Sequence, residues 1–91
     1  DSERRQILLT IQQPPSQTLI DAVVDALTTT EGVFQAELLR STRDAAVVSF
    51  QLTGKTRLVV DRLSIIEIGG YTLDPEQIVG DTMVFRPVSR Q

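Results

Sequence analysis

The chain has 91 residues, a formal net charge of -3 at pH 7, and neither cysteine nor histidine. Its length fits one domain, and the missing cysteines exclude disulfide scaffolds, thiolate metal sites and cysteine nucleophiles. The missing histidines remove the commonest general base and the commonest transition-metal ligand, and the acidic balance disfavours nucleic acid and anionic membranes as partners. No apolar run is long enough to insert directly into a bilayer.

The first third of the chain predicts a strand and then a helix. Apolar and polar residues alternate over Gln6–Gln12, which is typical of a strand, and two prolines end it. Ser16 or Thr18 can cap a helix that runs to about Thr29, and Gly32 is a natural stop after it. The apolar residues of this helix recur at helical spacing: Leu19, Ile20, Val23, Val24 and Leu27.

The stretch Gly32–Leu52 predicts a β-hairpin that is buried on one face only. In its first strand Phe34, Ala36 and Leu38 share the apolar face. The apolar face of its second strand is formed by Ala46, Val48, Phe50 and Leu52. These two sets point the same way only if Leu38 lies opposite Val48 or a residue two away. That register predicts an odd number of loop residues, three or five, at the tip.

The last third predicts a second helix and a second hairpin. The helix is expected over about Lys55–Ile66 and ends before two glycines; its expected buried stripe is Leu58, Val59, Leu63 and Ile66. The segment Tyr71–Arg86 is strand-like, and Gly80-Asp81 suits a two-residue hairpin turn. Pro75 places its surroundings at a sheet edge or in a loop.

This order of elements predicts an α+β fold, a ferredoxin-like βαββαβ sandwich. It would have an antiparallel sheet in the order 4-1-3-2, two helices on one face, and an extra C-terminal hairpin strand. We expect residues 1–91 to form a single ferredoxin-like domain, with its core at about residues 6–86, that comes from a larger protein.

Over about residues 6–79 the pattern resembles the ferredoxin-like family of small modules. Its heavy-metal-associated members hold their metal with two cysteines in the first loop, which here is Gln13–Gln17 and has none. Acylphosphatases use an arginine in that loop, which has no basic residue here. RNA-recognition motifs stack bases on aromatic residues of the first and third strands. Here the first strand has none, and Phe50 on the third is expected to face the core. Because these residues are missing, together with histidine and cysteine, we expect no metal, no cofactor, no nucleic acid and no enzymatic activity.

We expect a non-catalytic protein–protein interaction or assembly module of a larger bacterial protein. The partner would be a second copy or another subunit, bound through the open sheet face or an edge strand. Arg40 and Arg43 at the hairpin tip could also contact an acidic partner. The residues expected on the open face are Leu8, Thr10, Leu39, Val47 and Ser49.

An alternative is a regulatory domain similar to ACT domains, which bind a small molecule at a dimer interface. Their ligand sites often use the loop between the first strand and the first helix. In this chain that resemblance places Gln13, Ser16 and Gln17 near the ligand. Two prolines in the same loop remove two backbone donors. A gain of thermal stability with a small molecule would distinguish this alternative from a docking module.

Overall fold

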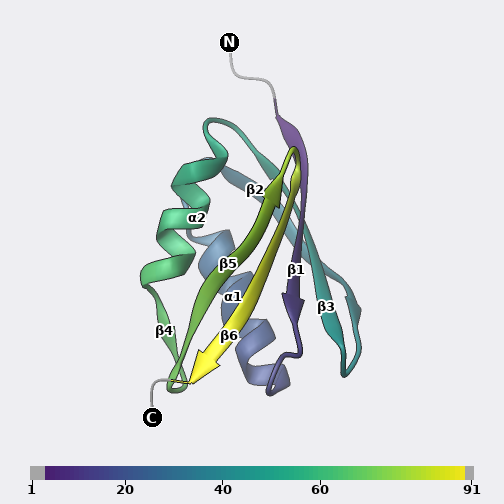
Figure 1. The fold of residues 1–91 in the computed structure, drawn as a ribbon. Coiled ribbons are helices and arrows are strands. Elements are labelled where there is room, and N and C mark those ends of the chain that lie inside the picture. Colours follow the sequence, from purple (N-terminus) through teal and green to yellow (C-terminus); the bar gives the residue numbers. More distant parts are fainter. Residues whose placement is uncertain (1–3, 90–91) are drawn as a thin grey trace.

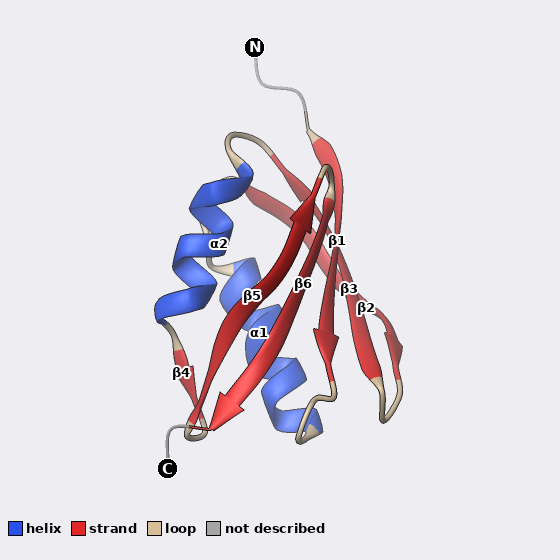
Figure 2. Cartoon of the chain, in the orientation of Figure 1, coloured by secondary structure: helices blue, strands red, loops and turns tan. Residues whose placement is uncertain are grey.

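The computed structural model describes residues 4–89, which form one six-stranded mixed sheet and two helices (Figure 1). The ends of the predicted domain, residues 1–3 and 90–91, lie outside the described residues. The sheet curls around the helices, and both helices lie on the same face of it (Figure 2). The elements are β1 (Arg5–Gln12), α1 (Gln17–Thr28), β2 (Val33–Ser41), β3 (Ala45–Leu52), α2 (Thr56–Ile65), β4 (Glu67–Ile68), β5 (Tyr71–Val79) and β6 (Thr82–Ser89).

The strand order corrects the predicted ferredoxin-like sandwich. The sheet runs β2-β3-β1-β6-β5-β4, so β2, β3 and β1 stand as expected. The place beside β1 is taken by β6, which runs parallel to β1, and not by an antiparallel fourth strand. The sheet is therefore mixed, and the expected order 4-1-3-2 is wrong.

The composition of the last hairpin explains this difference. Its turn at Gly80-Asp81 is confirmed, since Val79 pairs with Thr82. The second strand of the hairpin carries Met83 and Phe85, which are fully buried. The first strand carries Pro75, which cannot donate to a neighbouring strand. The more apolar β6 therefore takes the interior position, and β5 lies toward the sheet edge, as the proline predicts.

The β2–β3 hairpin confirms the predicted register but not all of the predicted apolar face. Leu38 lies opposite Val48, and three residues separate the two strands. A bulge between Phe34 and Glu37, where Gln35 has a φ of +54°, shifts the alternation before that point. As a result Val33 is buried, whereas the side chain of Phe34 is 39% exposed.

The two helices lie close to their predicted positions. Ser16 caps α1, where the backbone N–H of Leu19 donates to its hydroxyl oxygen at 3.3 Å. In α2 the predicted buried stripe is wrong at Leu58, which is 65% exposed. Val60 is buried in its place. Helix α2 therefore turns a different side toward β5 than the one we expected.

The core fills the space between the helices and the concave face of the sheet. Helix α1 packs against β2, and α2 packs against β5. Each large apolar side chain that is fully buried in such a core contributes about 1.5–3 kcal/mol. The strands supply Ile7, Leu9, Ile11, Val48, Phe50, Met83 and Phe85, and the helices supply Leu19, Ile20, Val23, Leu27, Val59 and Leu63.

Candidate functional site

Four predicted contact residues lie side by side on the convex face of the sheet, which we call the outer sheet face. In the ladder between β1 and β3, Leu8 is opposite Ser49 and Thr10 is opposite Val47. These residues alternate with Ile7, Leu9 and the other residues that point to the helices. The structure therefore brings together the four residues on β1 and β3 that the sequence placed on this face.

Strand β6 adds two residues to the outer sheet face that the sequence analysis missed. Thr82 lies beside Leu8, and Val84 lies beside Thr10. Thr82 and Val84 alternate with the buried Met83, which indicates that they lie on the solvent-facing side of the strand. That signal is present in the sequence, but it could not be linked to Leu8 without knowing that β6 is the neighbour of β1.

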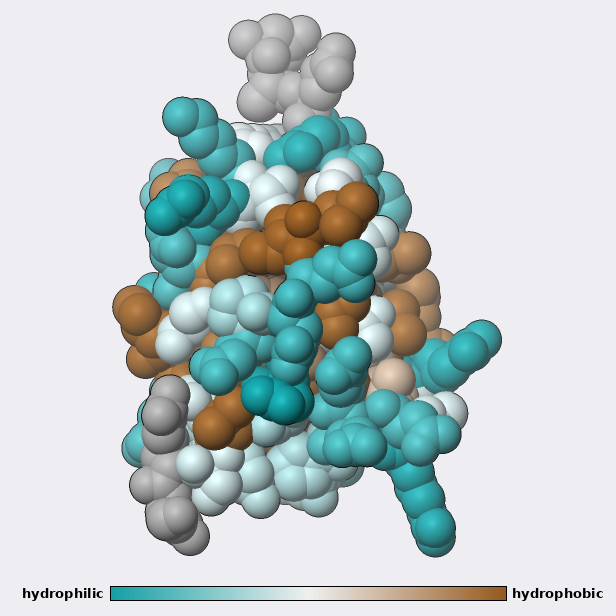
Figure 3. Space-filling view, in the orientation of Figure 1, coloured by the Kyte–Doolittle hydropathy of each residue, from teal (hydrophilic) through white to brown (hydrophobic). Residues whose placement is uncertain are grey.

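The centre of the outer sheet face is apolar and only partly covered. The side chain of Leu8 is 40% exposed, and Val47, Val84 and Thr10 are each half-buried. Ser49 is buried, and its hydroxyl oxygen accepts a hydrogen bond from the amide of Gln6. Figure 3 looks onto this side and shows hydrophobic surface gathered in its upper half, over β5, β6 and β1.

The remaining predicted contact residues lie on the β2–β3 hairpin. Arg40 is opposite Val47, so it belongs to the flank of the outer sheet face. Leu39 is the extra residue of a second bulge and is 55% exposed. Arg43 lies in the hairpin loop and is exposed. The structure therefore brings Arg40 to the face and leaves Arg43 at the tip.

The residues of the small-molecule alternative are exposed and take part in local hydrogen bonds. The side-chain amide of Gln17 donates to Asp21 at 2.9 Å, and the backbone N–H of Gln13 donates to the carbonyl of Asp44 at 2.8 Å. Ser16 is occupied as the cap of α1. A ligand that used the side chains of Ser16 and Gln17 would compete with their bonds, and the ACT-like alternative stays a prediction.

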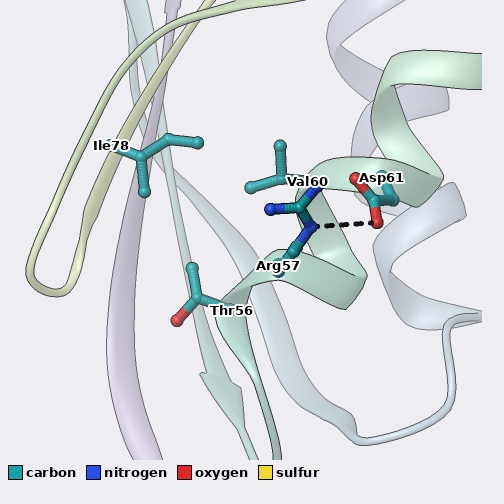
Figure 4. Close-up of a pocket in the computed structure, with 5 residues that line it drawn as sticks. All are labelled: Thr56, Arg57, Val60, Asp61 and Ile78. Atoms are coloured by element: carbon teal, nitrogen blue, oxygen red, sulfur yellow. Dashed lines mark ion pairs between the residues drawn. The ribbon is translucent and has the colours of Figure 1, made fainter.

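A pocket of about 360 Å³ lies elsewhere, between α2 and the end of β5. Figure 4 shows Ile78 on β5 and Val60 on α2 on opposite sides of it. Arg57 and Asp61 line its rim and form an ion pair with a nitrogen–oxygen distance of 3.7 Å. The fifth lining residue is Thr56, the first residue of α2. Local sequence patterns do not reveal this pocket, because its two walls, Val60 and Ile78, come from different elements of the chain.

The described residues contain no group of three or more carboxylate, cysteine or histidine side chains that could hold a metal ion. Over residues 4–89, the helices are too short and too polar to cross a membrane. Comparison with known protein families, with curated proteins and with solved structures finds no match for the chain. The candidate sites therefore depend on the geometry of this chain alone.

Proposed function

We propose that this domain is a non-catalytic protein-interaction module that self-associates through the outer sheet face. The observation that carries the proposal is the partly exposed apolar centre of that face. Leu8 lies on β1, an interior strand of the sheet, and is still 40% exposed. Val47 and Val84 are half-buried on the neighbouring strands. Covering these side chains with a partner would remove their apolar area from water, which favours association.

The geometry favours the face over the edge strand β2. An edge strand binds a partner strand through a continuous row of backbone N–H and C=O groups. In β2 that row is interrupted by two bulges, one after Phe34 and one after Leu38. Bulges of this kind protect edge strands from pairing with other chains. The interior strands β3, β1 and β6 instead present a regular surface, since the two ladders that join β1 to β3 and to β6 contain no bulge.

Sedimentation velocity over a concentration series tests the proposal. We expect the wild-type chain to self-associate, and Leu8→Asp and Val47→Asp to abolish association while the domain stays folded. Leu58→Asp is the matched control, because Leu58 is exposed on α2 and lies outside the outer sheet face. A wild-type chain that is monomeric at every concentration would contradict the proposal. Unfolding of the Leu8→Asp variant, seen by circular dichroism, would show that the face is core and would also contradict it.

A further inference from the structure

We propose that the groove between α2 and the end of β5 binds an extended acidic segment of another polypeptide chain. This site is separate from the outer sheet face and does not depend on self-association. It combines an apolar pocket, a short free strand edge and two cationic side chains at the start of α2, of which, among the described residues, only Arg57 has an acidic partner, Asp61. The pocket favours an apolar side chain, the strand edge favours an extended backbone, and the cationic side chains favour acidic residues.

The pocket selects an apolar side chain. Its walls are Val60 and Ile78, and Ile78 is 44% exposed although it alternates with the outward-facing Val79. Figure 4 shows the side chain of Ile78 directed toward α2 across an open space. An apolar side chain of a bound segment would fill this space and shield the exposed part of Ile78 from water.

The free edge of β5 selects an extended backbone. On the side away from β6, β4 pairs with β5 only at Tyr71 and Thr72. Farther along β5, Pro75 has no N–H group and is followed by a bulge. A new strand could therefore pair regularly with this edge of β5 only at Gln77–Val79. This short stretch lies beside the pocket, because Ile78 is its middle residue. An added strand can bond to such an edge while its alternate side chains enter neighbouring pockets.

The charge around the pocket selects an acidic segment. Lys55 precedes the pocket residue Thr56 and has no ion pair among the described residues. Arg57 lines the pocket, and its pair with Asp61 is weak because both side chains are largely exposed. The first turn of α2 has no acidic residue, and no side chain caps it. The positive end of this helix therefore adds to the attraction for a negative group.

These features together describe a segment in which acidic residues lie two positions before and two positions after an apolar residue. In a strand, neighbouring side chains point to opposite sides. One apolar residue would enter the space between Val60 and Ile78, and the acidic residues two positions away, which point to the same side, would lie near Lys55 and Arg57. A basic segment with the same apolar residues should bind much more weakly.

Fluorescence anisotropy with two labelled hexapeptides tests this site. One peptide has the sequence Glu-Thr-Val-Thr-Glu-Thr, and the other has lysine in place of both glutamates. We expect the wild-type domain to bind the acidic peptide and to prefer it to the basic one by about tenfold or more, with weaker binding as salt rises. Absence of binding by the acidic peptide, or equal binding of both peptides, would overturn the proposal.

Three variants locate the binding. Arg57→Glu and Ile78→Asp should each weaken binding of the acidic peptide by about tenfold or more. Arg62→Glu makes the same charge change on α2 outside the pocket, so it should alter binding by about twofold or less. Equal losses for Arg57→Glu and Arg62→Glu would show that only net charge matters and would overturn the proposal.

Amide chemical shifts in a nitrogen-15 NMR titration with the acidic peptide then separate this site from the outer sheet face. We expect the largest changes at Gln77–Val79 and in the first turn of α2. Changes centred on Leu8 and Val84 would overturn the groove proposal and leave the proposed function standing. The Leu8→Asp variant should bind the peptide as the wild type does, so the two proposals can fail independently.

Discussion

The guanidinium group of Arg5 donates a hydrogen bond to the hydroxyl oxygen of Thr56 at 3.1 Å, although 51 positions separate the two residues. The same group donates to the carbonyl of Gly54 at 2.8 Å. It also lies 3.5 Å from a carboxylate oxygen of Asp81 in the β5–β6 turn. One side chain at the start of β1 therefore holds the loop before α2 and the last hairpin turn in place.

Replacing Arg5 by methionine should lower the free energy of unfolding by about 1–2 kcal/mol, because two hydrogen bonds from a charged donor are lost. Asp81→Asn should cost about 0.5 kcal/mol or less, since its ion pair is long and about half exposed. Urea denaturation of both variants measures the difference. An equal cost for the two would show that the ion pair, and not the bonds to Gly54 and Thr56, is the main contribution.

Gly32→Ala should destabilise the domain more than Gly54→Ala. Both glycines have positive φ, +89° and +103°, so alanine is strained at either position by about 1 kcal/mol or more. Only at Gly32 would the new Cβ also meet a backbone atom, the carbonyl oxygen of Thr53 at 2.9 Å; at Gly54 there is open space. Thermal denaturation should therefore give a lower midpoint for Gly32→Ala, and equal midpoints would contradict the close approach.

Phe50→Ala should cost about 3–5 kcal/mol, because Phe50 is fully buried in the core. Phe34→Ala should cost only about 1 kcal/mol, the value of a partly exposed ring and its contact with Arg4, whose guanidinium carbon lies 4.2 Å from the ring centre. Chemical denaturation of the two variants compares the same substitution inside and outside the core. A large cost at Phe34 would show that the bulge in β2 does not turn this ring outward.

Gln35→Gly should raise the free energy of unfolding by up to about 1 kcal/mol, because Gln35 has a φ of +54°, which glycine adopts without steric cost. Gln51→Gly is the control: Gln51 lies in the regular part of β3, where glycine weakens a strand by about 0.5–1 kcal/mol. The two changes should therefore shift the urea midpoint in opposite directions. A loss of stability at both positions would contradict the left-handed conformation at Gln35.

Local sequence signals predicted the elements, and long-range competition decided their arrangement. Leu38 and Val48 are neighbours because one hairpin can bury its apolar face in few registers, and this could be calculated from alternation. The position of β6 could not be predicted in this way. It depends on a comparison between two strands: whether β6, with Met83 and Phe85, or β5 buries more apolar area when it lies beside β1. The exposure of Leu58 and Phe34 likewise depends on the rotation of α2 and on a bulge, which local patterns do not encode.

The same limits apply to the candidate sites. Leu8, Thr10, Val47 and Ser49 were placed on one face correctly, since the parity of two neighbouring strands is a local property. Val84 was missed because its neighbour in the sheet is remote in sequence. The pocket between Val60 and Ile78 was missed for the same reason, since it exists only where α2 meets β5.

The parallel pairing of β1 with β6 sets the order in which the chain can complete its fold. Leu9 at one end of the sequence pairs with Met83 near the other, so the two central strands come together only by closing almost the whole chain into a loop. Contacts of such high sequence separation slow folding. During synthesis, β1, β3 and both helices emerge before β6, and the backbone groups along one edge of β1 stay without a neighbouring strand until the last hairpin leaves the ribosome. The final strand thus acts as the closing element of the sheet.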